Sequence, residues 1–173
     1  MPTLWPTLRT KGRLVALLMA LGALGLGLTA VLLANLLRLD ACHLCIFQRL
    51  THFVIGLLLL LACWSWQRKI LALAFLAGAA AFSVWGMTAS AQQSWLQWFP
   101  ASGLNCAIAE PDLTEQVIDW LGRHYPLFFM ATGDCGSKDL VIFGLSLANW
   151  SFLAFLALFA GCALLFVTKM RRV

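Results

Sequence analysis

Long apolar runs with few interruptions dominate this chain. Three runs contain no charged residue, at 14–37, 70–89 and 140–168. A fourth run, at 46–67, contains one formal charge, Arg49, near its start. Because about 20 consecutive apolar residues are enough for a helix to cross a bilayer, the pattern predicts an all-α membrane protein. We expect a single domain over residues 1–173, a four-transmembrane-helix bundle with spans at about 14–37, 46–67, 70–90 and 143–168.

Composition and charge distribution indicate the class of protein and its orientation. The chain is 62% hydrophobic and only 11% charged, whereas an average soluble domain has roughly 25% charged residues. Eight basic residues and no acidic ones occupy the N-terminus, the turn between the second and third spans, and the C-terminus (Arg9, Lys11, Arg13, Arg68, Lys69, Lys169, Arg171, Arg172). Under the positive-inside rule these segments are cytoplasmic, so the loops at about 38–45 and 91–142 lie outside. The net charge of +5 reflects this sorting and does not indicate a nucleic-acid partner.

The long outer loop contains signals of local structure. Asp112 and Glu115 have the spacing of a helix capping box. The apolar residues beside them fall on one helical face: Leu113, Val117, Trp120 and Leu121. The pattern predicts a short amphipathic helix on the membrane surface. Further on, the sequence Gly-Asp-Cys-Gly at 133–136 predicts a turn that exposes Cys135.

Four of the six cysteines fall in the two outer loops. Cys42 and Cys45 form a C-x-x-C pair directly after the first span, and Cys106 and Cys135 lie in the long loop. All four therefore face the oxidising side of the membrane, where disulfides persist. The other two cysteines lie within spans toward the cytoplasmic side, where we interpret them as small buried residues: Cys63 and Cys162.

The C-x-x-C pair has the chemistry of a redox site. Its spacing allows a small disulfide ring at a helix start, where free backbone N–H groups and the helix dipole favour a thiolate. Arg49 follows Cys45 by four residues and therefore shares a helix face with it. Its positive charge would favour a thiolate or an anionic form of a bound electron acceptor. His52 lies three residues beyond Arg49, on a nearby face.

Plainer interpretations of these residues remain open. Arg49 can be an interface anchor whose charged end reaches back to water, and His43 and His52 can be ordinary polar residues of the membrane interface. Both cysteine pairs can be structural disulfides. A metal site at Cys42, His43 and Cys45 is not expected, because ligands this close together rarely make a tetrahedral set without a second pair.

The segment from Ala41 to Arg49, with the sequence ACHLCIFQR, resembles the bacterial DsbB family of disulfide bond formation proteins. That family has four spans, a C-x-x-C in the first periplasmic loop, an arginine four residues after its second cysteine, and another cysteine pair in the long loop. Here the second pair looks like Cys106 and Cys135. The stretches LQWFP and Gly-Asp-Cys in the long loop also look like family signatures. The resemblance covers about residues 10–168.

The resemblance implies an oxidoreductase of the bacterial inner (cytoplasmic) membrane, with its active cysteines facing the periplasm. Its partners would be the lipid bilayer, the membrane quinone pool and a periplasmic DsbA-like thioredoxin-fold protein. Its cofactor would be a quinone, either ubiquinone or menaquinone. Cys106–Cys135 would accept electrons from the protein partner, and Cys42–Cys45 would accept them from the loop pair. The quinone would take them from Cys45 with help from Arg49, and His52 is a further candidate for the quinone site.

The chain departs from the family pattern before the loop proline. Some members carry a histidine there, whereas this chain has Gln92 and Gln93. The resemblance therefore assigns no quinone-binding role to that position in this chain.

Two other functions fit parts of the sequence. A four-span structural or adaptor protein could use the external disulfides only to brace its loop, although it would have no use for a C-x-x-C at a helix start. A relative of the same family could serve a dedicated partner in place of a general DsbA-like protein. Dithiol oxidation by the purified protein would separate the first alternative from an oxidoreductase.

Overall fold

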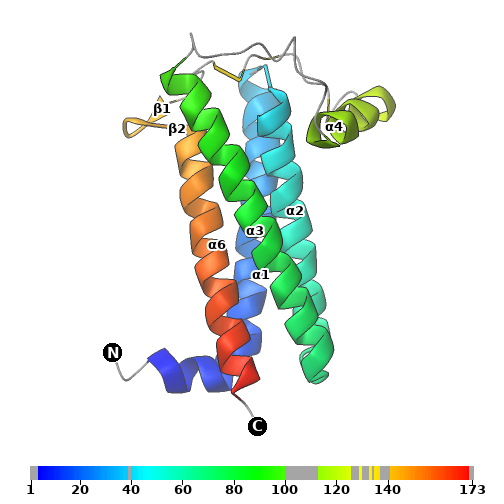
Figure 1. Ribbon diagram of the computed structural model, residues 1–173, viewed down its shortest axis with the longest axis vertical. Coiled ribbons are helices and arrows are strands. Elements are labelled where there is room, and N and C mark those ends of the chain that lie inside the picture. Colours follow the sequence, from blue (N-terminus) through cyan, green and yellow to red (C-terminus); the bar gives the residue numbers. More distant parts are fainter. Residues whose placement is uncertain are drawn as a thin grey trace.

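Four long helices form an up-and-down bundle in the computed structural model, which describes residues 4–38, 40–99, 113–125, 129, 133, 135–136 and 141–171. The helices are α1 (Leu4–Leu37), α2 (His43–Trp64), α3 (Lys69–Trp98) and α6 (Leu147–Met170) (Figure 1). Each has a segment long and apolar enough to cross a membrane, and the expected four-helix membrane fold is confirmed. Both chain ends lie at one end of the bundle, the termini end, whereas α2 starts at the opposite end, the cysteine end.

The boundaries of the first three long helices differ from the expected spans. α1 bends at Lys11, whose φ of −108° and ψ of 15° are not helical, and Figure 1 shows the part before the bend lying across the termini end. α2 begins at His43, earlier than expected, because Cys42 caps it: the Cys45 N–H donates to Cys42 Sγ at 3.4 Å. α3 continues to Trp98, so residues 91–98, expected in the loop, are helical.

Small residues allow the helices to approach closely. A Cβ added to Gly56 of α2 would lie 2.6 Å from Leu24 of α1, and one added to Gly161 of α6 would lie 2.5 Å from Met19 of α1. Three alanines of α1 are fully buried at the same helix interfaces: Ala16, Ala20 and Ala23. Lipid tails are as apolar as the side chains, so close packing of this kind is what holds such a bundle together.

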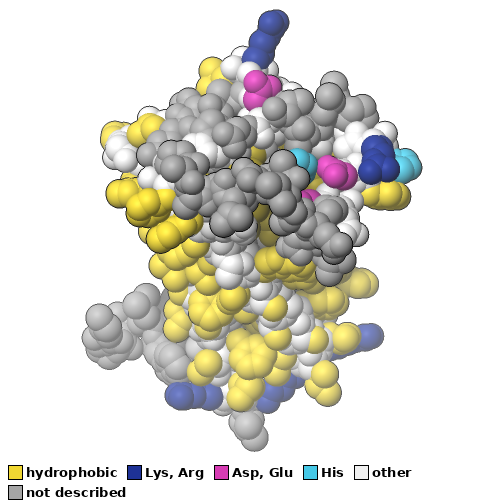
Figure 2. Space-filling view, turned by 45° about the horizontal axis from the view of Figure 1, so that its top comes forward, with side chains coloured by type: hydrophobic (Ala, Val, Ile, Leu, Met, Phe, Trp, Pro, Cys, Tyr) yellow, Lys and Arg dark blue, Asp and Glu magenta, His cyan; other side chains and the backbone are white. Residues whose placement is uncertain are grey.

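The bundle is least closely packed along one seam. α2 packs extensively against both α1 and α3, and α6 packs extensively against α3, but α6 contacts α1 much less. Figure 2 shows hydrophobic side chains over the middle of one face, whereas the acidic side chains visible there lie near the cysteine end. Because packing is loosest between α1 and α6, this seam is where a cavity open to the lipid is expected.

In the described part of the chain, two small elements lie at the cysteine end. The expected amphipathic helix is α4 (Leu113–His124), which lies beside α2 (Figure 1). Its buried contact is Ile118, packed on Ile46 and Phe47, whereas Val117 and Trp120 of the expected apolar face are 50% and 57% exposed. The proposed cap Asp112 lies outside the described residues.

A two-stranded hairpin precedes α6, where the fourth span was expected to begin. Its strands, β1 (Val141–Ile142) and β2 (Leu145–Ser146), pair antiparallel. Phe143 and Gly144 form the turn with positive φ values of 54° and 80°, the pattern of a tight hairpin turn. The indole Nε1 of Trp150 donates to the carbonyl oxygen of Ile142 at 3.1 Å and so ties the hairpin to α6.

Candidate redox site

Three thiols meet at the cysteine end of the bundle. Cys42 directly precedes α2 and Cys45 lies in its first turn, with 3.1 Å between their sulfur atoms. The side chain of Cys135, from the long loop, hydrogen-bonds to that of Cys42. Cys42 is 1% exposed and Cys135 only 7%, so the expectation that the turn exposes Cys135 is wrong. The loop brings this thiol inward, onto the C-x-x-C pair.

A glycine explains how the loop comes so close. The N–H of Gly133 donates to the carbonyl oxygen of Ala41 at 3.2 Å. A Cβ at Gly133 would overlap the backbone carbonyl of Asp40, so a side chain at this position is excluded. Gly133 therefore allows the backbone contact that carries Cys135 to Cys42. Cys106, the other predicted loop cysteine, lies outside the described residues.

A pair of buried glutamines holds the sulfur atom of Cys45. Gln93 Nε2 donates to Cys45 Sγ at 2.9 Å and lies 3.7 Å from Cys42 Sγ. Gln48 Nε2 donates to Gln93 Oε1 at 2.7 Å, which fixes the orientation of the Gln93 amide. Sequence reasoning missed Gln48 and gave Gln93 no role. The sequence did offer a signal, because placing a polar residue inside a membrane span costs free energy and such residues tend to be functional.

The two cysteines of the pair have different electrostatic environments. The hydrogen bond with Cys135, then that with Cys45, and then burial raise the pKa of Cys42, so this residue keeps its proton. Cys45 receives the Gln93 N–H and stands at the positive end of the α2 dipole, where negative charge on sulfur is stabilised. Because a better-stabilised thiolate leaves more readily, attack on a Cys42–Cys45 disulfide is favoured at Cys42, the sulfur that Cys135 contacts.

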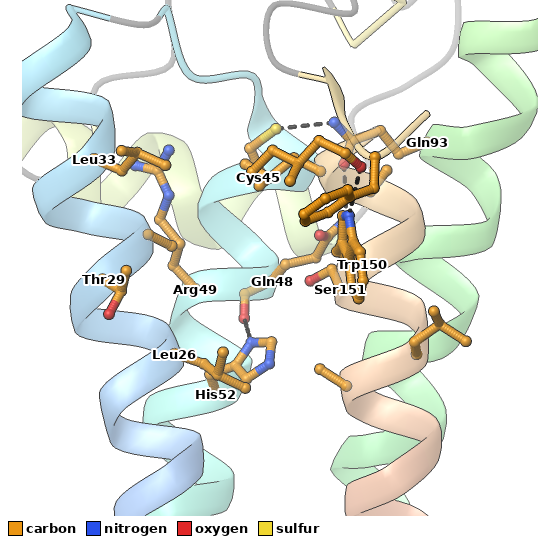
Figure 3. A pocket seen from close by; sticks show the side chains of 17 residues that line it. Leu26, Thr29, Leu33, Cys45, Gln48, Arg49, His52, Gln93, Trp150 and Ser151 are labelled. Carbon is orange, nitrogen blue, oxygen red and sulfur yellow. Dashed lines mark hydrogen bonds between the residues drawn. The ribbon is translucent and has the colours of Figure 1, made fainter. Parts of the chain in front are cut away.

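A cavity of about 650 Å³ extends from Cys45 along the seam between α1 and α6 (Figure 3). Arg49 and His52 both line it, so the structure brings together the three residues that were predicted for the acceptor site. Figure 3 shows Arg49 pointing toward Leu33 of α1, while the His52 ring lies farther along α2 from Cys45.

The remaining walls of the cavity are mostly apolar, from α1, α6 and the hairpin, with Phe143 among the lining residues. Leu26 of α1 and Leu153 of α6 line it and are 49% and 45% exposed. The cavity therefore opens on the lipid-facing side of the bundle, which suits a hydrophobic ligand.

The other two cysteines lie away from this site. Cys63 and Cys162 belong to the hydrophobic core and are 7% and 0% exposed. Cys63 Sγ donates to the carbonyl oxygen of Arg13 at 3.4 Å. Their surroundings are those of small buried residues, as the sequence suggested.

Comparison with known proteins gives a consistent result. Residues 12–165 match the family described as disulfide bond formation protein DsbB. A protein named Disulfide bond formation protein B from Dechloromonas aromatica (strain RCB) is 41% identical over 153 residues, which cover 88% of this chain and 91% of that protein. Proteins with the same name from Verminephrobacter eiseniae (strain EF01-2) and Nitrosomonas europaea are 35% and 31% identical, over 85% and 84% of this chain and 81% and 87% of theirs.

Proposed function

Because this chain belongs to the DsbB family, whose members are membrane proteins of disulfide bond formation, we propose that it reoxidises a periplasmic DsbA-like thioredoxin-fold protein and passes the electrons to a membrane quinone. The observation that carries the proposal is the line of thiols from the long loop to the cavity. Cys135 contacts Cys42, Cys42 lies 3.1 Å from Cys45, and Cys45 lines the cavity.

Electrons enter at the loop pair. The reduced partner attacks the Cys106–Cys135 disulfide, and thiol–disulfide exchange leaves the partner oxidised and both loop cysteines as thiols. Cys106 is the cysteine assigned to the partner, because Cys135 is buried against Cys42. This exchange moves two electrons and two protons from the partner to the loop.

The second exchange passes the electrons to the C-x-x-C pair. The Cys135 thiolate attacks Cys42 of the Cys42–Cys45 disulfide, and Cys45 leaves as a thiolate held by the Gln93 N–H. Cys106 then attacks Cys135, which restores the loop disulfide and releases Cys42 as a thiol. The pair now holds the two electrons, with Cys45 facing the cavity.

The cavity residues fit a quinone headgroup. The cavity volume of about 650 Å³ lies within the usual range of about 300–1,000 Å³ for small-ligand sites, and the cavity opens toward lipid. Arg49 can donate to a quinone oxygen and stabilise negative charge there, and the buried His52 Nε2 lacks a hydrogen-bond partner among the described residues. When bound, a quinone supplies an acceptor for two electrons and two protons. Cys42 and Cys45 return to the disulfide as they lose them.

The orientation proposed for this chemistry places the cysteine end in the periplasm of a bacterial inner membrane. The supporting observation is charge: the N-terminal part of α1, the α2–α3 turn and the end of α6 lie at the termini end (Figure 1), and the sequence around them carries basic residues and no acidic ones. Catalysis at the opposite end therefore meets oxidising conditions and a soluble partner.

The test is quinone reduction by the purified full-length protein. A reduced periplasmic thioredoxin-fold dithiol protein is the electron donor, and ubiquinone and menaquinone analogues are compared as acceptors by their absorbance. We expect catalytic quinone reduction that requires both donor and protein, with one mole of quinone consumed per mole of disulfide formed. A protein that binds the partner but never reduces quinone would match the adaptor alternative and overturn the proposal. Turnover with a specific thioredoxin-fold partner alone would indicate the dedicated relative.

A further inference from the structure

His52 lines the cavity and carries a buried ring nitrogen without a hydrogen-bond partner among the described residues. The side chain is 5% exposed, and Nε2 has no partner among the described residues. Its other ring nitrogen, Nδ1, lies 2.8 Å from the backbone carbonyl oxygen of Gln48 (Figure 3). Buried polar atoms are nearly always paired, so an unpaired one on a residue that lines a cavity points to a ligand.

The Gln48 contact determines what Nε2 can do. A backbone carbonyl oxygen only accepts hydrogen bonds, so Nδ1 must carry the hydrogen. In the neutral ring Nε2 is then a hydrogen-bond acceptor. Among the described residues no acidic side chain lines the cavity, and Arg49 already brings a positive charge there. A second positive charge on His52 would be uncompensated, which favours the neutral ring.

Packing on both sides fixes the direction of this acceptor. The ring of His52 lies against that of Phe155 of α6, with 4.1 Å between centroids. On the α1 side a Cβ added to Gly27 would lie 3.4 Å from His52 Cβ. The ring is therefore held against α6, and the base of the side chain is held close to α1. His52 lies seven residues from Cys45, or about 10 Å along the helix.

Only one redox form of a quinone matches a fixed acceptor. The two carbonyl oxygens of an oxidised quinone accept hydrogen bonds, whereas the two hydroxyl groups of the hydroquinone donate them. We propose that His52 Nε2 accepts a hydrogen bond from a hydroxyl group of the hydroquinone, so that the cavity binds the reduced form in preference to the oxidised form. This inference rests on the proposed quinone function and names His52 as the residue that discriminates between redox forms.

Preferential binding of the reduced form favours the reaction. The Cys42–Cys45 dithiol becomes a disulfide while the quinone becomes a hydroquinone, and the two thiol protons end on its two oxygens. His52 neither gains nor loses a proton overall. By linkage, each tenfold preference for the hydroquinone raises the potential of the bound two-electron couple by about 30 mV, which draws electrons from Cys45.

The test measures affinity separately for the two redox forms. Full-length protein with Cys45→Ser, which blocks electron exchange, is titrated anaerobically with a short-chain ubiquinone analogue and with its hydroquinone, and binding is followed by calorimetry. In this background His52→Phe keeps an aromatic ring against Phe155 but removes Nε2. We expect it to weaken hydroquinone binding roughly two- to tenfold, the size of one neutral hydrogen bond, and to leave oxidised quinone binding unchanged or tighter.

Two companion variants keep the result interpretable. Thr51→Val is the matched control, because Thr51 is buried next to His52, bonds to the carbonyl oxygen of Phe47 and does not line the cavity; we expect both affinities to stay unchanged. His52→Gln can replace the acceptor, so we expect partial recovery of hydroquinone binding, and it serves as a second variant if His52→Phe does not fold.

The outcomes separate this inference from the proposed function. Equal loss of both forms, loss of the oxidised form alone, or no change in His52→Phe would overturn the role of His52 while leaving the quinone site in place. If the protein with His52 intact bound neither form, the proposed function itself would fail.

Discussion

The two halves of the bundle differ in how α1 meets α6. Toward the termini end the helices touch so closely that a Cβ on Gly161 would lie 2.5 Å from Met19. Toward the cysteine end the same helices leave room for a cavity of about 650 Å³. Three buried polar side chains, Gln48, His52 and Gln93, line that cavity.

The difference shows how one simple bundle can combine stability with reactivity. Close packing of small residues holds the helices together in a solvent that provides no hydrophobic driving force between them. Because this packing stabilises the bundle toward the termini end, the cysteine end can contain an unpaired polar atom, a less closely packed seam between α1 and α6, and thiols in contact. The following variants should affect one half and leave the other unchanged.

The largest effect on turnover is expected from replacing a cysteine at the cysteine end, as compared with replacing the two cysteines of the packed core. Cys45→Ser removes the thiol that faces the cavity and should abolish quinone reduction without loss of folded protein. The double variant Cys63→Ala/Cys162→Ala changes only the packed core and should turn over near the wild-type rate per folded molecule. Turnover with the partner protein, normalised to folded protein, measures both. Loss of turnover in the double variant at normal protein level would show that the packed half also carries electrons.

Arg49 should control the affinity of the cavity for quinone. Arg49→Gln removes a charged donor worth about 1.5–3 kcal/mol, which corresponds to a roughly ten- to hundredfold rise in quinone KM. Arg49→Lys should recover only part of the affinity, because an ammonium lacks the planar fork of the guanidinium. Steady-state kinetics per folded molecule decide the matter. Unchanged KM and kcat in Arg49→Gln, together with lower expression, would leave Arg49 as a membrane anchor.

Added volume should have opposite consequences in the two halves. Gly56→Ala places a methyl group 2.6 Å from Leu24, and we expect overpacking to cost about 1–3 kcal/mol, seen as a lower Tm. Gly22→Ala is the matched control on α1, because nothing lies within 4 Å of the added carbon. Ala154→Leu instead fills part of the cavity, so it should raise quinone KM with little change in Tm. Equal Tm in all three variants would contradict the contrast between the halves.

The smallest effect is expected at Gln93. Gln93→Ala removes one hydrogen bond to Cys45 Sγ, and a contribution of about 0.5–1.5 kcal/mol predicts a smaller fraction of Cys45 thiolate and alkylation of Cys45 that is slower by up to roughly two- to tenfold. Gln92→Ala changes the exposed neighbour and should have no effect. Alkylation of the reduced protein at fixed pH, read at Cys45 by mass spectrometry, measures the rate. Equal rates in the two variants would mean that the Gln93 contact does not stabilise the thiolate.

The fold was largely predictable, because an apolar run of span length has few alternatives to a helix in lipid. Helix ends were less predictable. α3 runs eight residues past the expected boundary at residue 90, since no proline interrupts it before residue 100 and no charge marks its end. The start of α2 depends on Cys42 acting as a cap, a role in which sulfur is only a weak acceptor.

The site was predictable only where its residues lie on one helix. Helical spacing places Cys45, Arg49 and His52 along α2, and all three line the cavity. The burial of Cys135 could not be derived in the same way, because it depends on Gly133 packing against a segment more than 90 residues earlier in the chain. Gln93 belongs to a different helix and reaches Cys45 only through tertiary packing.

The most direct test of the electron path asks which cysteine of the C-x-x-C pair exchanges with the loop. Two full-length variants are compared in membranes, and both carry Cys106→Ser, Cys63→Ala and Cys162→Ala. The first also carries Cys45→Ser, so it keeps only Cys42 and Cys135. The second also carries Cys42→Ser, so it keeps only Cys45 and Cys135. After mild oxidation, the rate of disulfide formation is read from cross-linked peptides by mass spectrometry. The contact between Cys135 and Cys42 predicts that the Cys42–Cys135 disulfide forms markedly faster. Faster formation of Cys45–Cys135, or no disulfide in either protein, would contradict the path from the loop through Cys42 to Cys45 and the cavity.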